Sequence, residues 1–454
     1  MSLPRLLRVN RPFRDYWTGQ TISLFGDQIA LLAVPLLAVL TLHADAQQMG
    51  LLAAVELAPS LFFAVHLGVW AERRRSRRTL LIFADLGRAA LLLGVPLAAL
   101  FGVLSMQILY VVAFLTGTLG VLFMVAEQTV FTSLVRPGDY VEANSLLIGS
   151  RSVAVVGGKT LGGLLVAVLT APVAILVDGL SFLASAFFVR RVEVPEPPAA
   201  TGDSGGLAAG MRFVHRTPLL QASLLGTATF NIFNTAFWAL LVLFATRELG
   251  LGSGAIGIAL GVGALGSVLG SAVAKRVNTR IGLGNALIFS FILAPLPLFL
   301  VPLASGPPAL SMAMLTAAEF GSGVGVMVLD VGLGSVQAAV IPDQLRSRVW
   351  GAILFVNWGV RPLGALGGGL LAGSIGLRPT MWIAAIGGMA GVLWLIPSRM
   401  SDVEDVSEEG LALSSSPAPI DPAVAAAAVE PVASQAASVP AEPVAAHAAA
   451  AAES

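Results

Sequence analysis

Twelve apolar runs, most of them about 20 residues or longer, follow one another along almost the whole chain. A run of this length can cross a bilayer as a helix, because a helix satisfies its own backbone hydrogen bonds there. We therefore expect an all-α integral membrane protein with twelve transmembrane helices. The predicted spans are 16–42, 48–70, 79–103, 107–133, 143–169, 172–190, 219–246, 253–274, 283–304, 309–339, 348–374 and 379–397.

Composition excludes several other classes of protein. The chain is 56% apolar, only 11% charged and free of cysteine, so a disulfide framework and a thiolate metal site are ruled out. It has no phosphate-binding Gly-Lys-Ser/Thr loop, and its four histidines are scattered. We expect a protein that is not an enzyme, has no cofactor or metal and binds no nucleic acid. We also expect a monomer.

Basic residues predict how the helices are oriented. If both termini are cytoplasmic, 20 of the 26 basic residues fall in cytoplasmic segments, and only Arg247 and Arg378 fall on the opposite face. Four more lie within helices. This asymmetry is what the positive-inside rule requires, and one helix more or fewer would destroy it. The sequence therefore predicts a multi-pass protein with both termini in the cytoplasm.

The chain also divides into two similar halves. Pro137 and Pro342 each end a helix, and the same shift of 205 residues brings Leu161-Gly162-Gly163 onto Leu366-Gly367-Gly368. Two six-helix repeats around a central site are a transporter architecture. The predicted parts are a cytoplasmic N-terminus (1–15), an N-terminal half (16–190), a cytoplasmic linker (191–217), a C-terminal half (218–400) and a disordered Ala/Pro-rich tail (401–454). Within the linker, Leu207 to Arg216 fits a short amphipathic helix at the membrane surface.

A very basic loop gives the first family resemblance. GVWAERRRSRR, starting at Gly68, resembles the loop between the second and third helices of major facilitator transporters, G-x-x-x-D-R-x-G-R-R. Glu72 replaces the usual aspartate, and Arg75 and Ser76 stand where the pattern has Gly and Arg.

Longer stretches resemble one branch of this superfamily. FRDYWTGQTISLFGDQIALLAVPLLAVLTL, ADLGRA, VDGLSFLASA, IPDQLRSRVWG and NWGVRPLGALGGG are similar to drug and siderophore exporters such as the enterobactin exporter and macrolide efflux pumps. The resemblance covers roughly residues 12–397. It implies two pseudo-symmetric halves in a bacterial inner (plasma) membrane that export a small organic compound against proton entry. Uptake or lipid transport on the same fold is one alternative, and a non-transporting membrane sensor or scaffold is another.

The resemblance also implies a cytoplasmic gate of charged groups. The alternative is a solvated surface network. Asp85 and Arg88, three residues apart on one helix face, form a natural local pair. The gate residues are Gly68, Glu72, Arg73, Arg77, Asp85, Arg88, Glu127 and Arg151.

Carboxylates within the spans are candidates for proton coupling. A charge at the bilayer centre costs about 2.5–3.5 kcal/mol, so such groups must pair or face a wet cavity. Asp27, near the middle of the first span, leads, followed by Glu56, three residues before Pro59. Glu319 and Asp330 follow, with Arg361 as a counter-ion. For each of them a purely structural ion pair is the alternative.

Lys159 lies where exporters of this branch have proline, in Gly158-Lys159-Thr160-Leu161-Gly162-Gly163. It is a cavity cation, which binds an anionic substrate or tunes a carboxylate, or a buried lysine paired with an acidic neighbour, or a lysine that snorkels toward water. Amides beside aromatic rings suit a semi-polar ligand, although inter-helix hydrogen bonding explains them as well. The other cavity candidates are Asn231, Asn234, Trp238, Asn357, Trp358 and Arg361, and the predicted helix-packing glycines are Gly158, Gly162, Gly163, Gly367 and Gly368.

Overall fold

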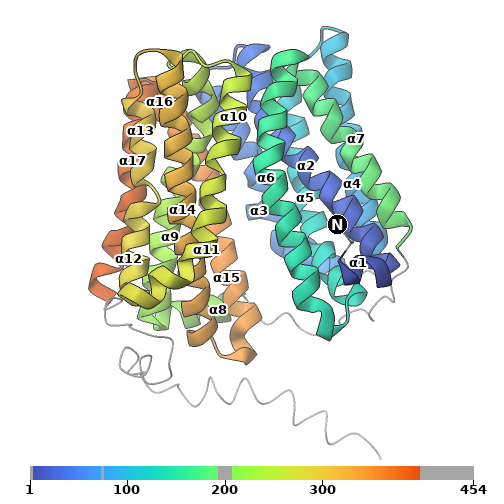
Figure 1. Ribbon diagram of the computed structural model, residues 1–454, viewed down its shortest axis with the longest axis vertical. Helices are drawn as coiled ribbons and strands as arrows, with labels where there is room; N and C mark the ends of the chain where they lie inside the picture. The colour runs from blue at the N-terminus through green and yellow to red at the C-terminus, as the bar shows by residue number, and fades with distance from the viewer. Residues whose placement is uncertain (1–3, 73–75, 193–206, 399–454) are drawn as a thin grey trace, which may run out of the picture.

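The computed structural model describes residues 4–72, 76–192 and 207–398, and this part of the chain is a bundle of long helices without strands (Figure 1). The N-terminal half contains α1 (Arg5–Val9), α2 (Arg11–Leu40), α3 (Ala46–Glu72), α4 (Arg77–Leu100), α5 (Met106–Leu134), α6 (Tyr140–Val168) and α7 (Ala171–Arg190). After α8 (Leu207–Arg216), the C-terminal half contains α9 (Pro218–Arg247), α10 (Ser253–Gly263), α11 (Leu265–Ile281), α12 (Leu283–Leu293), α13 (Leu300–Leu303), α14 (Pro308–Val340), α15 (Arg346–Gly359), α16 (Arg361–Ile375) and α17 (Leu377–Met389). Short 3₁₀ turns lie at Pro137–Asp139, Leu296–Phe299, Asp343–Leu345, Ala390–Trp394 and Ile396–Ser398.

The predicted number of spans is confirmed. In the described part of the chain, 11 helical segments are long and apolar enough to cross a membrane, and α3, with 27 residues, lies between the first two of them. Most ends agree with the prediction to within three residues. The first span begins earlier, at Arg11, and the eighth ends later, at Ile281. Several spans are broken helices: α10 gives way to α11 at Ala264, and α15 to α16 at Val360, directly before Arg361 and Pro362.

The two halves stand side by side and meet mainly at one end (Figure 1). We call the end that carries α1 and α8 the α1 end, and the other the opposite end. The largest apolar core lies at the opposite end and contains residues of both halves, such as Leu36 of α2 and Leu240 of α9. Toward the α1 end, the other cores each belong to one half, such as those around Leu81 and Phe291. The halves are therefore held together chiefly at the opposite end.

The predicted amphipathic segment is confirmed as α8, which packs against α15 and α9. Val214 is buried there, and Gly210 lies so close to the backbone of Arg348 that a side chain would not fit. The rest of the predicted disordered linker (193–206) and the Ala/Pro-rich tail lie outside the described residues.

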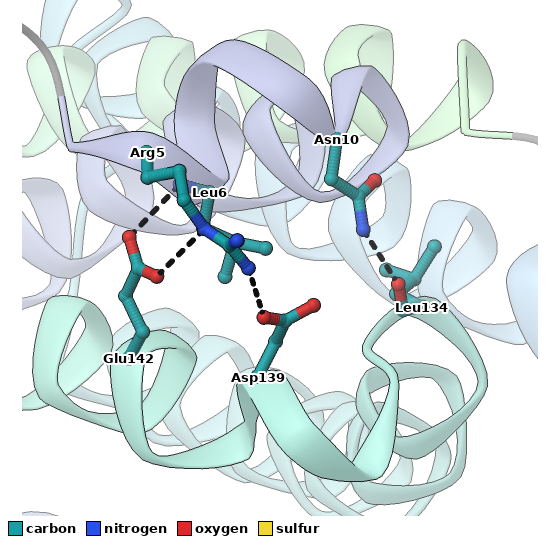
Figure 2. A network of polar contacts seen from close by, with 6 residues as sticks. All are labelled: Arg5, Leu6, Asn10, Leu134, Asp139 and Glu142. Carbon is teal, nitrogen blue, oxygen red and sulfur yellow. Dashed lines mark hydrogen bonds and ion pairs between the residues drawn. The ribbon is translucent and has the colours of Figure 1, made fainter.

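The first helix is fastened to the N-terminal half by polar contacts (Figure 2). The Arg5 guanidinium lies 2.7 Å from a carboxylate oxygen of Asp139 and 3.9 Å from one of Glu142. Glu142 also accepts a hydrogen bond from the backbone N–H of Leu6. Asn10 caps α2 by accepting from the N–H of Phe13, and its amide donates to the Leu134 carbonyl. These contacts tie α1 to the turn between α5 and α6.

Candidate functional site

A cavity of about 320 Å³ lies between the two halves. The N-terminal half contributes α2, α3 and Lys159 of α6, and the C-terminal half contributes α9 and α10. The wall is mostly aliphatic, and its polar or aromatic members include Glu56, Lys159 and Trp238. This size and character are typical of small-molecule sites. The lining residues are Leu31, Leu32, Val34, Pro35, Met49, Leu52, Ala53, Glu56, Leu57, Lys159, Thr235, Trp238, Ala239, Leu241, Val242 and Leu260.

Two symmetric pairs of glycines bring the halves together beside this cavity. A Cβ on Gly163 of α6 would lie 2.6 Å from the Cα of Gly257 on α10. A Cβ on Gly50 of α3 would lie 2.6 Å from the Cα of Gly369 on α16. No side chain fits at either contact, so the backbones pack directly against each other.

The glycine contacts correct the predicted repeat. Gly162 packs on Ile29 of α2, and its equivalent Gly368 packs on Ala236 of α9, so the shift between these glycines is 206 residues and not 205. Gly158, Gly162, Gly163 and Gly368 pack closely, as predicted. The prediction for Gly367 is wrong, because a Cβ there would meet nothing within 4 Å.

In each half, a glycine makes room for a larger side chain between the first and last membrane-spanning helices. The glycine is on the first helix of the N-terminal half and on the last helix of the C-terminal half. In the N-terminal half, Gly26 of α2 leaves room for Asp178 and Ser181 of α7. In the C-terminal half, Gly387 of α17 leaves room for the ring of Phe233 on α9. The same repeat therefore accommodates a carboxylate in one half and a phenyl ring in the other.

Lys159 forms an ion pair across the two halves. Its Nζ donates to Oε1 of Glu319 on α14 at 3.0 Å, and the side chains are 14% and 10% exposed. The Glu319 stem packs against Gly263, and the Lys159 ammonium lies 5.4 Å from the centroid of the Trp238 ring. Lys159 thus combines two of the alternatives that its sequence left open, since it lines the cavity and is also paired with a carboxylate. Sequence reasoning placed both residues in the site but could not pair them.

Glu56 and Asp27 occupy different positions. Glu56 lines the cavity and is exposed to it, whereas Asp27 is half-buried and is not one of the lining residues. Among the described residues, neither carboxylate has a hydrogen-bond or ion-pair partner within contact distance. Asp27 lies within electrostatic range of Arg88 and Arg151.

The N-terminal half also contains a buried charge network. Asp85 and Arg88 form the predicted ion pair within α4, and the guanidinium lies between the rings of Phe123 and Phe182, at 4.5 and 4.0 Å from their centroids. Asp178 accepts from the Ser181 hydroxyl. This second buried carboxylate was not among the predicted site residues, although its place within an apolar span could have marked it.

The predicted gate residues do not share one environment in this structure. Glu127 accepts a hydrogen bond from the Tyr16 hydroxyl at 2.8 Å, Arg77 is buried and Arg151 is exposed. Arg73 lies outside the described residues, and of Gly68 and Glu72 only the helical backbone is described. The Asp85–Arg88 ion pair and the hydrogen bond from Tyr16 to Glu127 both lie within the N-terminal half. Their role as a gate stays a prediction.

The C-terminal candidates gather along α9 and the break between α15 and α16. Asn231 of α9 donates to the Asn357 side chain of α15 at 3.1 Å. The Arg361 guanidinium stacks 4.2 Å from the centroid of the Trp358 ring and lies within electrostatic range of Asp330. Asn234 is half-buried, and only Trp238 of this group lines the cavity.

At the opposite end a guanidinium crosses between the halves. Arg247, at the end of α9, donates to the backbone carbonyls of His43 at 3.1 Å and Ala44 at 2.9 Å, between α2 and α3. No sequence pattern indicates this contact, because backbone carbonyls are present at every residue. These hydrogen bonds join the two halves at the opposite end.

Two six-helix halves around a shared cavity define the fold of a major facilitator transporter. The chain belongs to the transmembrane secretion effector family of these transporters, whose profile matches residues 7–429. It is 25% identical over 417 residues to the uncharacterized MFS-type transporter YfiS of Bacillus subtilis (strain 168), covering 87% of this chain and 95% of that protein. It is 28% identical over 387 residues to the multidrug efflux pump Tap of Mycolicibacterium fortuitum, covering 78% and 88%.

Solved structures share the fold at low identity. A bacterial homologue of the iron transporter ferroportin in its inward-facing state aligns with a TM-score of 0.69 and 17% identity, over 87% of this chain and 99% of that one. The outward-facing state with soaked iron gives a TM-score of 0.56 at 17% identity, over 85% and 98%. Both comparisons show the same fold.

Proposed function

We propose that this transporter exports a small organic compound from the bacterial cytoplasm across the inner membrane, driven by proton entry. The observation that carries the proposal is the cavity between the halves, in which an exposed carboxylate (Glu56) lies in a largely aliphatic wall. The similarity to a multidrug efflux pump supports export as the direction.

In this proposal the α1 end faces the cytoplasm, as the distribution of basic residues predicts. The contacts of Arg247 and the glycine pairs then close the cavity toward the outside. Export requires these contacts to open while the halves close at the α1 end, where the charged gate residues lie. A single polypeptide suffices for this cycle, so the working unit is a monomer.

Asp27 and Glu56 are the residues that we propose to carry the proton. Both are carboxylates near the middle of their helices, and neither is neutralised by an ion pair in the described part of the chain. A carboxylate that must repeatedly lose and regain its charge needs such an unpaired position beside a wet cavity. Glu319, held by Lys159, and Asp330, near Arg361, are better suited to structural or substrate-linked roles.

The test is transport into everted membrane vesicles from a pump-deficient bacterium, using a panel of dyes and antibiotics with and without a protonophore. We expect uptake that the protonophore stops, with Asp27→Asn and Glu56→Gln each removing the gradient-driven part. Glu248→Gln, outside the cavity, is the matched control and keeps full transport. Uptake only by right-side-out vesicles would instead establish import. An absence of flux and of lipid movement in a well-expressed protein would favour a sensor or scaffold.

A further inference from the structure

Two charged groups in the cavity have unused bonding capacity. The Glu56 carboxylate is exposed to the cavity and has no partner among the described residues. The Lys159 ammonium has three N–H donors, and within the same part of the chain its one hydrogen bond goes to Glu319. Two donors of Lys159 and a whole carboxylate therefore remain for a ligand.

The position of Glu319 keeps Lys159 ready for a ligand. Its Cβ and Cγ pack where a side chain on Gly263 would lie, so the carboxylate is held in place. From there it anchors the ammonium at 3.0 Å, while Lys159 still lines the cavity beside Trp238. An ammonium fixed by one bond loses little conformational entropy when a second acceptor arrives.

We propose that the cavity binds a zwitterionic compound with an apolar body. Its cationic group bonds to Glu56, its anionic group bonds to Lys159, and its apolar part lies on Trp238 and the aliphatic wall. The proposal rests on the proposed function, in which this cavity is the transport site. It deepens that function by naming the class of substrate.

Compounds with a single charge satisfy only part of this site. A cation bonds to Glu56 but leaves the donors of Lys159 without a partner. An anion bonds to Lys159 but adds a like charge beside Glu56. In a cavity with mostly apolar walls, both unpaired groups and like charges are costly. A zwitterion avoids both costs.

Calorimetric binding to the purified full-length protein tests this with four forms of one dipeptide. The probes are alanyl-phenylalanine, its C-terminal amide, its N-acetyl derivative and the doubly blocked form, which present both charges, only the cation, only the anion and neither. We expect the zwitterion to bind about tenfold tighter than either singly charged form, the value of one charged hydrogen bond. Equal affinities, or tighter binding of a singly charged form, would overturn the proposal.

Variants assign each charge to its residue. Glu56→Gln should remove the advantage of the zwitterion over the N-acetyl form. Lys159→Gln with Glu319→Gln should remove its advantage over the amide, and the double change avoids a buried unpaired carboxylate. Lys275→Gln is the matched control, since Lys275 is the second of the two lysines and is exposed near the α1 end. If the double variant unfolds, Lys159→Arg keeps the charge and should keep the preference.

The two experiments can refute the proposed ligand class and the proposed export separately. Calorimetry needs no gradient, so zwitterion-selective binding without gradient-driven flux would refute the proposed export and leave the ligand class intact. Protonophore-sensitive dye export by a protein that prefers no zwitterion would do the reverse.

Discussion

Gly163 of one half packs directly against Gly257 of the other, backbone on backbone, with no room for a side chain between them. This contact and its symmetric counterpart, Gly50 with Gly369, lie between α6 and α10 and between α3 and α16. They set how closely the halves approach beside the cavity.

We expect Gly163→Leu to force the halves apart at the opposite end, because overpacking of a close contact costs about 1–3 kcal/mol. Spin labels on Thr170→Cys and Ser374→Cys, in a chain that has no other cysteine, measure the separation. Gly367→Leu on the related helix is the control, since a Cβ there would meet nothing within 4 Å. Equal distances in both variants would refute the role of the contact.

The bonds of Arg247 to His43 and Ala44 hold the halves together at the same end. Arg247→Ala should raise the population that is open there by about fivefold, corresponding to about 1 kcal/mol of hydrogen bonding. The same pair of spin labels reports it. Arg378→Ala is the control, because Arg378 bonds to the carbonyls of Pro302 and Ala304 within its own half. An identical shift in that variant would point to general loosening.

The ion pair of Asp85 and Arg88 should stabilise the N-terminal half. Asp85→Asn leaves the buried guanidinium without its counter-charge, and removing one partner of a buried pair costs about 3–5 kcal/mol. The melting temperature in detergent should fall clearly. Glu248→Gln breaks a half-exposed pair with Arg378, worth about 0–1 kcal/mol, and should change it little. A fully stable Asp85→Asn protein would contradict this reading.

Asn10 has two bonds, one that caps α2 and one that reaches the end of α5. Asn10→Ala should lower local stability by about 1 kcal/mol, with faster amide hydrogen exchange at the start of α2 and at the end of α5. Asn285→Ala, which loses a single bond to the Ile281 carbonyl, should change exchange only near α12. If exchange at α5 stays unchanged, the bond to Leu134 does not tie α1 to that helix.

The spans could be read from the sequence because a bilayer demands long apolar helices, and the runs of residues record this directly. Their ends were less certain where polar residues continue a helix beyond the apolar run, as in Lys275 to Ile281. The sequence shows the repeat but places it one residue off. The Leu-Gly-Gly alignment pairs Gly163 with Gly368, whereas the helix contacts make Gly162 the equivalent of Gly368.

Within the site, the sequence identified the ionisable residues but not their partners. Asp85 and Arg88 were paired because they lie one helical turn apart. Lys159 and Glu319 are 160 residues apart in different halves, and they meet only because α6 packs beside α10 and α10 packs beside α14. Such packing decides that Glu319 has an ion-pair partner and that Glu56 has none among the described residues.

In the N-terminal half Gly26 leaves room for the carboxylate of Asp178, whereas in the C-terminal half Gly387 leaves room for the uncharged ring of Phe233. The two halves therefore differ in the charge that they bury. The spans of the N-terminal half contain five carboxylates (Asp27, Glu56, Asp85, Glu127 and Asp178) and three basic groups (Arg88, Arg151 and Lys159), against Glu319, Asp330 and Arg361 in the other. Charged groups on which a membrane potential can act are therefore concentrated in one half of a fold whose backbone is nearly twofold symmetric.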